Sequence, residues 1–340
     1  MIDRASLGGF ILAGAVIVAS TASAAAEDTL RVAIAQRGAW ELAAAELGQQ
    51  AGIFKKQGLT LEIVYPESGD IEDRVKSGSI DVGVGANIMS VMHDYSFGAP
   101  VRIIGANLTG APAYWYVLAT SPIRTVKDLV GKTIAYAAHG SASHYGALDL
   151  IKQFQVRARL LSTGGAPAAF NELMASRIDV AYASPPFAVD EIDRGRIRVL
   201  ARANDVTTIR GKTVSVMITN ADTLQRRKDS IARFMTAYRE TIDWMYADPA
   251  SIKAYAGWAE VTEPVAQRQR DEFITKDMVS PDAIAGVKAV MKDAVTFRHL
   301  QTKLSRKQLT ELIQIPPRKV DRQSSCRFGL IGCGAGVTVP

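Results

Sequence analysis

The sequence predicts an α/β fold of two lobes, each a mainly parallel sheet flanked by helices, with two crossing segments that form a hinge. Two observations predict this fold. Strand-like and helix-like segments alternate twice, over residues 29–105 and again over 133–201, and such alternation is typical of parallel sheets covered on both faces. The segment SIDVGVGAN at 79–87 is also echoed by RIDVAYASP at 177–185. Paired echoes favour two lobes built on one plan.

The first 26 residues have the layout of a secretory signal peptide. Arg4 precedes an apolar run over 7–19, and an Ala22-Ser23-Ala24 step follows it. The run is shorter than the ~20 residues that a membrane-spanning helix needs. We therefore expect export, with a mature chain that begins near residues 25–27.

The first lobe is expected to open with the first strand–helix alternation. We expect strands at 30–35, 60–65, 80–84 and 101–105, and helices at 40–50, 70–76 and 88–95. The apolar and aromatic segment APAYWYVLA at 111–119 is interpreted as a strand that leaves this lobe.

The second lobe is expected to begin with Thr133–Phe154, a buried strand that runs directly into a helix. Gly140 between them can turn the chain with a positive φ, and Ser141 or Ser143 can cap the first helical turn. Backbone N–H groups then point out of the helix start, which makes a socket for an anion or a carbonyl group.

The rest of the chain continues the alternation and then becomes helical. We expect strands at 133–137, 157–161, 178–183 and 197–201, a strand at 212–219 that returns to the first lobe, and helices at 223–246, 249–257, 263–273 and from near Pro281 and Ser305. Pro249 and Pro281 suit the first turns of helices.

These elements divide the chain into four parts. Residues 1–26 form the signal peptide, 27–113 with 219–315 form lobe one, and 114–218 form lobe two including the hinge strands. Residues 316–340 form an atypical tail to which we assign no function.

Several segments together carry a resemblance to a known family. They are AQRGAW, SGSIDVGVGAN, DLVGKTIAYAAHGSASHYG and ELMASRIDVAYASPPF. Over residues 28–315 the chain resembles the periplasmic substrate-binding proteins of ABC importers of the nitrate, sulfonate and taurine type. The resemblance implies a monomeric periplasmic protein that closes two lobes around a small molecule, delivers it to a membrane permease and performs no chemistry.

The resemblance also implies which residues face the ligand. In open parallel sheets ligands sit beyond the carboxyl ends of the strands, where loops 36–40, 85–88, 139–144 and 183–187 are expected. With Tyr114 added as an aromatic wall, the expected ligand-binding residues are Gln36, Arg37, Gly38, Trp40, Ala86, Asn87, Tyr114, Gly140, Ser141, Ser143, His144, Ser184 and Pro185.

The ligand is expected to be a small organic anion. Several helix starts aimed at one cleft favour a negative group, and aromatic residues such as Trp40 and Tyr114 can supply flat walls, although some of the aromatic residues at 114–116 are expected to be core. A carboxylate or sulfonate fits both features. Arg37, directly after the first strand, is our hypothesis for its cationic partner.

An enzyme and a sensor are the alternatives to a transport protein. An enzyme using Ser141, Ser143 and His144 lacks a nearby carboxylate to orient the imidazole, and a thiamin-pyrimidine synthase of this fold carries a cysteine-rich iron motif, whereas the cysteines here are Cys326 and Cys333. A periplasmic sensor stays open as an alternative.

We expect no metal, cofactor or nucleic acid, because the histidines lack ligand spacing and the net charge of +6 is not gathered on one face.

Overall fold

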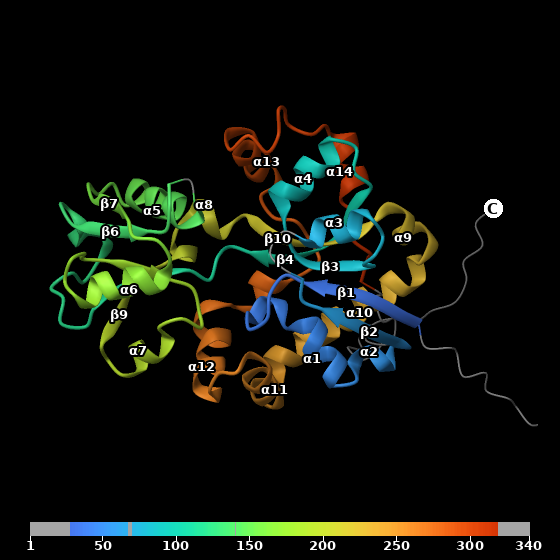
Figure 1. Ribbon diagram of the computed structural model, residues 1–340, viewed down its shortest axis with the longest axis horizontal. Helices are drawn as coiled ribbons and strands as arrows, with labels where there is room; N and C mark the ends of the chain where they lie inside the picture. The colour runs from blue at the N-terminus through green and yellow to red at the C-terminus, as the bar shows by residue number, and fades with distance from the viewer. Residues whose placement is uncertain (1–27, 67–69, 140, 319–340) are drawn as a thin grey trace, which may run out of the picture.

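The computed structural model describes residues 28–66, 70–139 and 141–318. They form two lobes that lie side by side along the longest axis of the molecule (Figure 1). The expected signal peptide, Gly140 and the tail from residue 319 lie outside the described residues.

The first lobe is built on a five-stranded sheet with strand order β2-β1-β3-β10-β4. Its strands are β1 Asp28–Ile34, β2 Leu59–Val64, β3 Val82–Asn87, β4 Val101–Thr109 and β10 Thr213–Asn220. β1 runs parallel to β2 and β3, whereas β10 runs antiparallel to both β3 and β4. The sheet is therefore mixed, and its fourth position is filled by a strand from much later in the chain.

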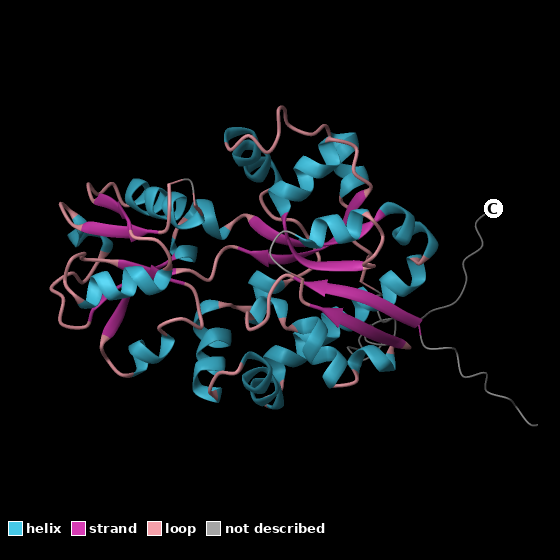
Figure 2. Ribbon diagram, viewed as in Figure 1, coloured by secondary structure: helices cyan, strands magenta, loops and turns pink. Residues whose placement is uncertain are grey.

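Helices cover both faces of this sheet (Figure 2). Those from the first part of the chain are η1 Trp40–Leu42, α1 Ala44–Gln50, α2 Ile53–Lys56, α3 Asp70–Lys76 and α4 Ile88–Ser96. Those from the last part are α9 Ala221–Arg226, α10 Lys228–Ala247, α11 Ala250–Ala259, α12 Glu263–Arg268, the π-helix η4 Gln269–Phe273, η5 Lys276–Val279, α13 Val287–Thr296 and α14 Arg306–Leu312.

The core of the first lobe lies on the two faces of the sheet. Met217 of β10 packs into the cluster with α1 and α10, while its neighbours Val216 and Ile218 pack into the cluster with α3, α4 and α13. Successive strand residues face opposite ways, so the adjacent residues Val216, Met217 and Ile218 serve both clusters. This is why these three consecutive positions of the strand are all apolar.

The second lobe contains a three-stranded sheet of order β8-β5-β9 and a β6-β7 pair, linked by one bridge between Ile134 and Val180. Its elements are β5 Tyr114–Leu118, η2 Val126–Leu129, β6 Thr133–Tyr136, α5 Ala142–Gln153, β7 Arg159–Ser162, α6 Ala166–Met174, β8 Ala181–Ala183, α7 Val189–Asp193 and β9 Ile197–Arg202.

Two segments connect the lobes, residues 110–113 and a segment from 203 to 212 that contains η3 Ala203–Asp205 and α8 Thr207–Arg210. They are hydrogen-bonded to each other: Gly110 N donates to Lys212 O at 2.9 Å and Ala111 N donates to Asn204 Oδ1 at 3.0 Å. Gly110 has φ of 84°, and a Cβ there would lie 2.4 Å from Asn204 Oδ1, so glycine lets the two segments cross closely.

Both expected crossing strands are present, but one lobe boundary differs. The segment 111–119, expected to leave the first lobe, contains β5, which pairs with β8 and β9 of the second lobe. The strand expected at 212–219 returns to the first lobe as β10 and pairs with β3 and β4, so residues 213–218 lie in the first lobe's sheet and not in lobe two, to which our division assigned them. Composition marks a strand but not its partner, because pairing is set by contacts distant in sequence.

The helical part also differs in its boundaries. The helix expected at 223–246 is divided at Arg227 into α9 and α10, and Pro249 is the N-cap of α11. No helix begins at Pro281; α13 begins at Val287, after Gly286 in the left-handed region. Residues 280–286 instead lie against β10, where Thr213 N donates to Ala285 O at 3.1 Å. Among the described helices, none has the length and apolar character needed to cross a membrane.

Candidate functional site

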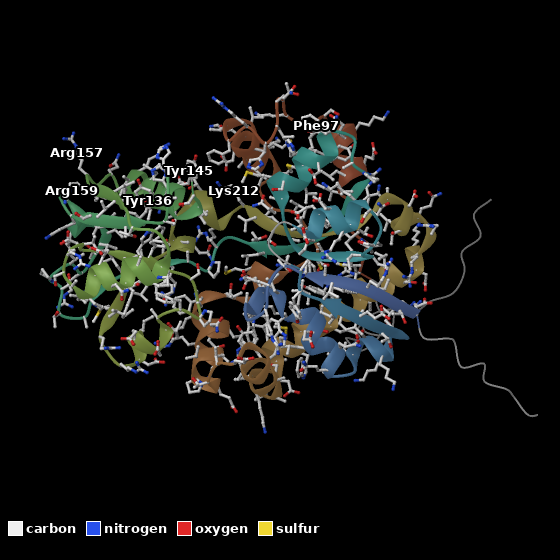
Figure 3. The ribbon with its side chains drawn as sticks, viewed as in Figure 1. Phe97, Tyr136, Tyr145, Arg157, Arg159 and Lys212 are labelled. Carbon is white, nitrogen blue, oxygen red and sulfur yellow. The ribbon has the colours of Figure 1, made fainter. Side chains whose placement is uncertain are left out.

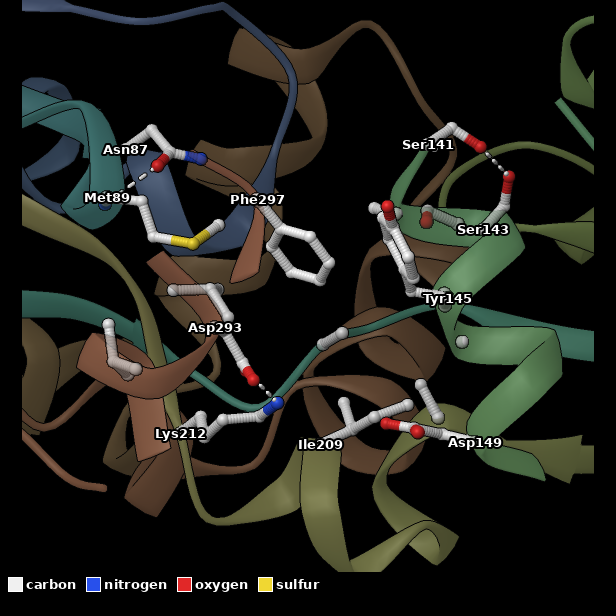
Figure 4. A pocket seen from close by; sticks show the side chains of 18 of the residues that line it. Asn87, Met89, Ser141, Ser143, Tyr145, Asp149, Ile209, Lys212, Asp293 and Phe297 are labelled. Atoms are coloured by element: carbon white, nitrogen blue, oxygen red, sulfur yellow. Dashed lines mark hydrogen bonds and ion pairs between the residues drawn. The ribbon is translucent and has the colours of Figure 1, made fainter. Parts of the chain in front are cut away.

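A cavity of about 530 Å³ lies between the two lobes beside the hinge (Figure 4). Both lobes and both crossing segments contribute to it. Its lining includes Asn87, Ile88, Met89, Val290, Asp293 and Phe297 from the first lobe, Trp115, Ser141, Ser143, Tyr145, Gly146, Asp149, Tyr182 and Ser184 from the second, and Ala111, Ala113, Ala203, Ile209 and Lys212 from the connecting segments.

The polar side of the cavity is formed by two helix N-termini from opposite lobes. At the start of α4, Asn87 Oδ1 accepts hydrogen bonds from Met89 N at 2.9 Å and Ser90 N at 3.3 Å. At the start of α5, Ser141 Oγ accepts from His144 N at 3.3 Å and lies 3.0 Å from Ser143 Oγ. Side-chain caps therefore already satisfy part of the free backbone donors at both helix starts.

The aromatic side of the cavity joins the lobes. The rings of Tyr145 on α5 and Phe297 at the end of α13 have centroids 4.2 Å apart at an angle of 35°, and Figure 4 shows both at the cavity. Trp115 is 3% exposed and its indole packs against α5, where a Cβ on Gly146 would lie 3.3 Å from Trp115 Cζ2. Among the described residues, Trp115 Nε1 has no hydrogen-bond partner.

The charged groups on the lining are two carboxylates and one ammonium. Lys212 Nζ lies 2.6 Å from Asp293 Oδ2, a pair that Figure 4 marks. Asp149 Oδ2 accepts a hydrogen bond from Thr208 Oγ1 at 2.8 Å and has no ion-pair partner among the described residues. Burial raises the pKa of the Tyr182 phenol, so this group is a neutral hydrogen-bonding side chain at neutral pH.

Four of the residues that the sequence analysis expected at the site line this cavity. They are Asn87, Ser141, Ser143 and Ser184. Asn87 is the last residue of β3, and the three serines follow the carboxyl ends of β6 and β8. This is expected for an open sheet, and it brings three different parts of the chain to one space.

Three expected residues are buried elsewhere. Trp40 is 1% exposed, its Nε1 donates to Tyr246 Oη at 3.0 Å, and its ring lies 4.6 Å from that of Tyr255. Tyr114 Oη donates to Phe187 O inside the second lobe. Ala86 is 2% exposed in β3. These side chains support the core, and the wall expected from Trp40 and Tyr114 is supplied by Trp115 and Tyr145.

Arg37 is exposed, and its Nε donates to Trp258 O at 2.9 Å at the end of α11. Its neighbours Gln36 and Gly38 also lie outside the cavity lining, as does Pro185, whose bond to Pro186 is cis. Arg37 therefore does not line this cavity, and its contact with an anion stays a prediction.

His144 is buried with its ring 4.5 Å from that of Tyr136, and it does not line the cavity. Among the described residues that line the cavity, none is a histidine or a cysteine. In the described part of the chain, no group of three or more His, Cys, Asp or Glu side chains could hold a metal ion.

The sequence analysis missed several residues of the lining. Tyr145 and Asp149 follow Ser141 at intervals of four, so one face of a helix starting at Ser141 includes all three, and this spacing could have identified them. Asp293 and Phe297 lie on a helix more than 140 residues away. No local signal in the sequence connects that helix to the cavity.

Comparison with known proteins identifies the family. The model of the family described as NMT1/THI5 like matches residues 41–252. The chain belongs to this family. The matched segment covers α1 to the start of α11. It thus includes every strand except β1, both crossing segments and the N-termini of α4 and α5.

Two relatives that match this chain are named as a periplasmic binding protein and as an enzyme. The chain is 26% identical over 215 residues to a Brachyspira hyodysenteriae protein named as an ABC transporter periplasmic binding protein, covering 57% of this chain and 59% of that one. It is 33% identical over 91 residues to the 4-amino-5-hydroxymethyl-2-methylpyrimidine phosphate synthase of Legionella pneumophila, covering 26% and 28%. The matches thus span less than two thirds of both relatives.

The fold is that of two-lobe periplasmic binding proteins. The periplasmic aliphatic sulphonate binding protein SsuA from Escherichia coli superposes with a TM-score of 0.65 at 19% identity, covering 92% of this chain and 96% of that one. At this identity the likeness concerns the fold, and it confirms the two-lobe α/β architecture expected from the alternation of strands and helices.

Proposed function

We propose that this protein is the soluble solute-binding component of an ABC importer, which captures one small organic molecule between its lobes and delivers it to a membrane permease. The observation that carries the proposal is the cavity itself, which is lined from both lobes and both crossing segments. A ligand that touches both lobes stabilises their closed arrangement, which is how hinge closure is coupled to binding.

We propose that Asn87, Ser141, Ser143 and Ser184 contact the ligand. They contribute amide and hydroxyl groups on the polar side of the cavity, while Trp115, Tyr145 and Phe297 enclose its apolar body. A mostly apolar cavity with a few polar groups is typical of small-molecule sites.

An anionic head group on the ligand stays a prediction from the sequence. The N-termini of α4 and α5 at the cavity favour a negative group. The charges on the lining oppose it, because Lys212 is paired with Asp293 while Asp149 has no cationic partner among the described residues. The proposed function, capture of an organic solute, therefore does not depend on the sign of the ligand's charge.

We assign the mature protein to the periplasm and expect it to act as a monomer. The assignment rests on the signal-peptide layout of residues 1–26 and on the Brachyspira relative, which is named as a periplasmic binding protein.

The test is to identify the ligand and ask whether it is returned unchanged. Protein purified without refolding is examined by native mass spectrometry, the retained molecule is identified, and stripped protein is then titrated with it. At 100 times its dissociation constant the ligand is expected to stabilise the fold by about 2.7 kcal/mol. Chemical conversion of the ligand during overnight incubation contradicts the proposal.

A second candidate function is an enzyme, and the relationship to the Legionella synthase favours it. Against it, the lining of the described cavity offers Ser141 and Ser143 without a histidine or cysteine, and hydroxyl nucleophiles need an adjacent base. The same incubation decides between the two functions. A third candidate function is that of a sensor. A sensor would use the same ligand site but present its liganded lobes to a receptor instead of a permease.

A further inference from the structure

We propose that the ligand captured in this cavity is an organic cation with an apolar or aromatic body. The inference rests on the proposed function, since it names the ligand class of the same site. It differs from the anion that the sequence analysis expected, and the reasons lie in the charges, the walls and the helix caps of the cavity.

The first reason is the balance of charge on the lining. Asp149 and Asp293 bring two carboxylates and Lys212 brings one ammonium, so the described lining carries a net charge of −1. The ammonium is used, because Lys212 Nζ lies 2.6 Å from Asp293 Oδ2. Among the described residues, Asp149 has only the neutral Thr208 hydroxyl as a partner, on one of its two oxygens. A partly buried carboxylate without a counter-ion favours a cationic partner.

The second reason is the chemistry of the walls. The cavity is bounded by the rings of Trp115, Tyr145, Tyr182 and Phe297. The face of an aromatic ring is electron-rich and attracts ammonium groups, most strongly where water is excluded. These same faces offer an anion no favourable charge interaction.

The third reason is that the two helix starts are already capped. Asn87 Oδ1 takes the hydrogen bonds of Met89 N and Ser90 N, and Ser141 Oγ takes that of His144 N. Part of the donors that an incoming anion would use are therefore occupied by side-chain oxygens. A cation meets oxygen acceptors at the same place, on Asn87, Ser141 and Ser143.

The arginines of the second lobe do not compensate for this negative lining. Arg157 and Arg159 project from the outer end of the second lobe, whereas Tyr145 and Lys212 lie where the lobes meet (Figure 3). Arg37, the partner expected for an anion, is bound to Trp258 O. No arginine contributes to the described lining of the cavity.

Asp149 lies on the same face of α5 as Tyr145, one helical turn further along. A cation held above the Tyr145 ring therefore has a carboxylate on the same helix within one turn, about 5 to 6 Å between Cβ atoms. The geometry points to Asp149 as the residue that selects the charge of the ligand.

The experiment uses two probes that share an aromatic body and differ in the sign of their charge, benzyltrimethylammonium and benzenesulfonate, with benzyl alcohol as the neutral reference. Ligand-free full-length mature protein is titrated with each probe by isothermal calorimetry and thermal unfolding. We expect benzyltrimethylammonium to raise the melting temperature and to bind at least tenfold more tightly than the other two probes.

Variants assign the effect to Asp149. Asp149→Asn keeps the shape and a hydrogen-bond acceptor for Thr208, and is expected to weaken benzyltrimethylammonium binding about tenfold. Lys212→Met leaves Asp293 uncompensated and is expected to strengthen that binding. The matched control is Glu62→Gln, which removes one negative charge from exposed β2 of the first lobe and is expected to leave the affinity unchanged.

Three outcomes overturn the inference. Tighter binding of benzenesulfonate shows an anion site and leaves the proposed function intact. No stabilisation by benzyltrimethylammonium, or equal affinity of wild type and Asp149→Asn, removes the charge selection that we propose. Conversion of the recovered natural ligand is a different result, and it contradicts the proposed function itself.

Discussion

Glu41 shows how the surroundings of a single residue control its pKa. It follows the buried Trp40 in η1, and burial raises the pKa of its carboxyl. The same carboxyl contributes to the raised pKa values of Tyr246 and Tyr255, for which burial is the larger cause. The first loop of lobe one is therefore occupied by a desolvated acid set among neutral phenols.

The raised pKa makes the contribution of Glu41 to stability depend on pH. A carboxyl with a folded-state pKa above its usual value of 4.5 binds its proton more tightly in the folded state. Its favourable contribution is present below pH 4.5 and is lost as pH rises through the folded-state pKa. We expect Glu41→Gln to be more stable than wild type at pH 8, with the difference shrinking toward pH 4. Urea unfolding across this range measures it.

Glu62→Gln, at an exposed position on β2, is the control for a general effect of net charge. The account of Glu41 fails when the stability difference between wild type and Glu41→Gln stays the same from pH 4 to pH 8.

At the level of residues, local chemistry was predictable and distant partners were not. Ser141 was expected as a cap from its place between a strand and a helix, and it caps α5. Trp40 was expected as a wall of the site, but Tyr246 and Tyr255 enclose it from more than 200 residues away. A sequence shows an aromatic residue after a strand without showing what packs on it.

Among the elements, α10 has a particular role because it ties the end of the described chain to the first lobe. Arg239 on α10 has a side chain that is 5% exposed, and its Nε lies 2.6 Å from Asp282 Oδ1. Its Nη2 donates to Pro316 O, and Arg318 Nε lies 2.8 Å from the other oxygen of Asp282. Asp282 thus neutralises a buried guanidinium and holds residues 316–318 against the lobe.

Removing Asp282 is expected to destabilise the first lobe. Asp282→Ala leaves the buried Arg239 charge without its carboxylate, which costs about 2 to 4 kcal/mol when one partner of a buried pair is lost. Guanidinium unfolding of the variant and wild type gives the difference. The matched control is Asp243→Ala, whose partners Lys276 and Arg318 are both half exposed, and for which a loss below about 1 kcal/mol is expected. Equal losses in both variants contradict this role of Asp282.

The elements themselves were largely predictable, while their partners and some ends were not. Alternation located β1 to β4 and α3 to within a few residues because each is a short periodic segment. The helix expected near Pro281 begins at Val287, since residues 280–286 are engaged with β10. The antiparallel direction of β10 and β5 followed from tertiary pairing that no local pattern reports.

On the scale of the whole molecule, the two lobes touch on both sides of the hinge. Tyr145 meets Phe297 beside the cavity, and Arg268 of α12 lies 2.7 Å from Asp193 of α7. Two short segments, residues 110–113 and 203–212, connect the lobes, so a change in their backbone angles moves one lobe as a unit relative to the other. The echoed segments predicted the two-lobe plan, but they did not predict these contacts between the lobes.

The central claim is that this chain is a binder that closes on one small molecule. Small-angle X-ray scattering of the stripped protein, before and after saturation with the ligand recovered from it, tests this claim most directly. We predict a smaller radius of gyration at saturation, reached at one ligand per chain and reversed when the ligand is dialysed away unchanged. A scattering curve that is identical with and without saturating ligand contradicts the claim.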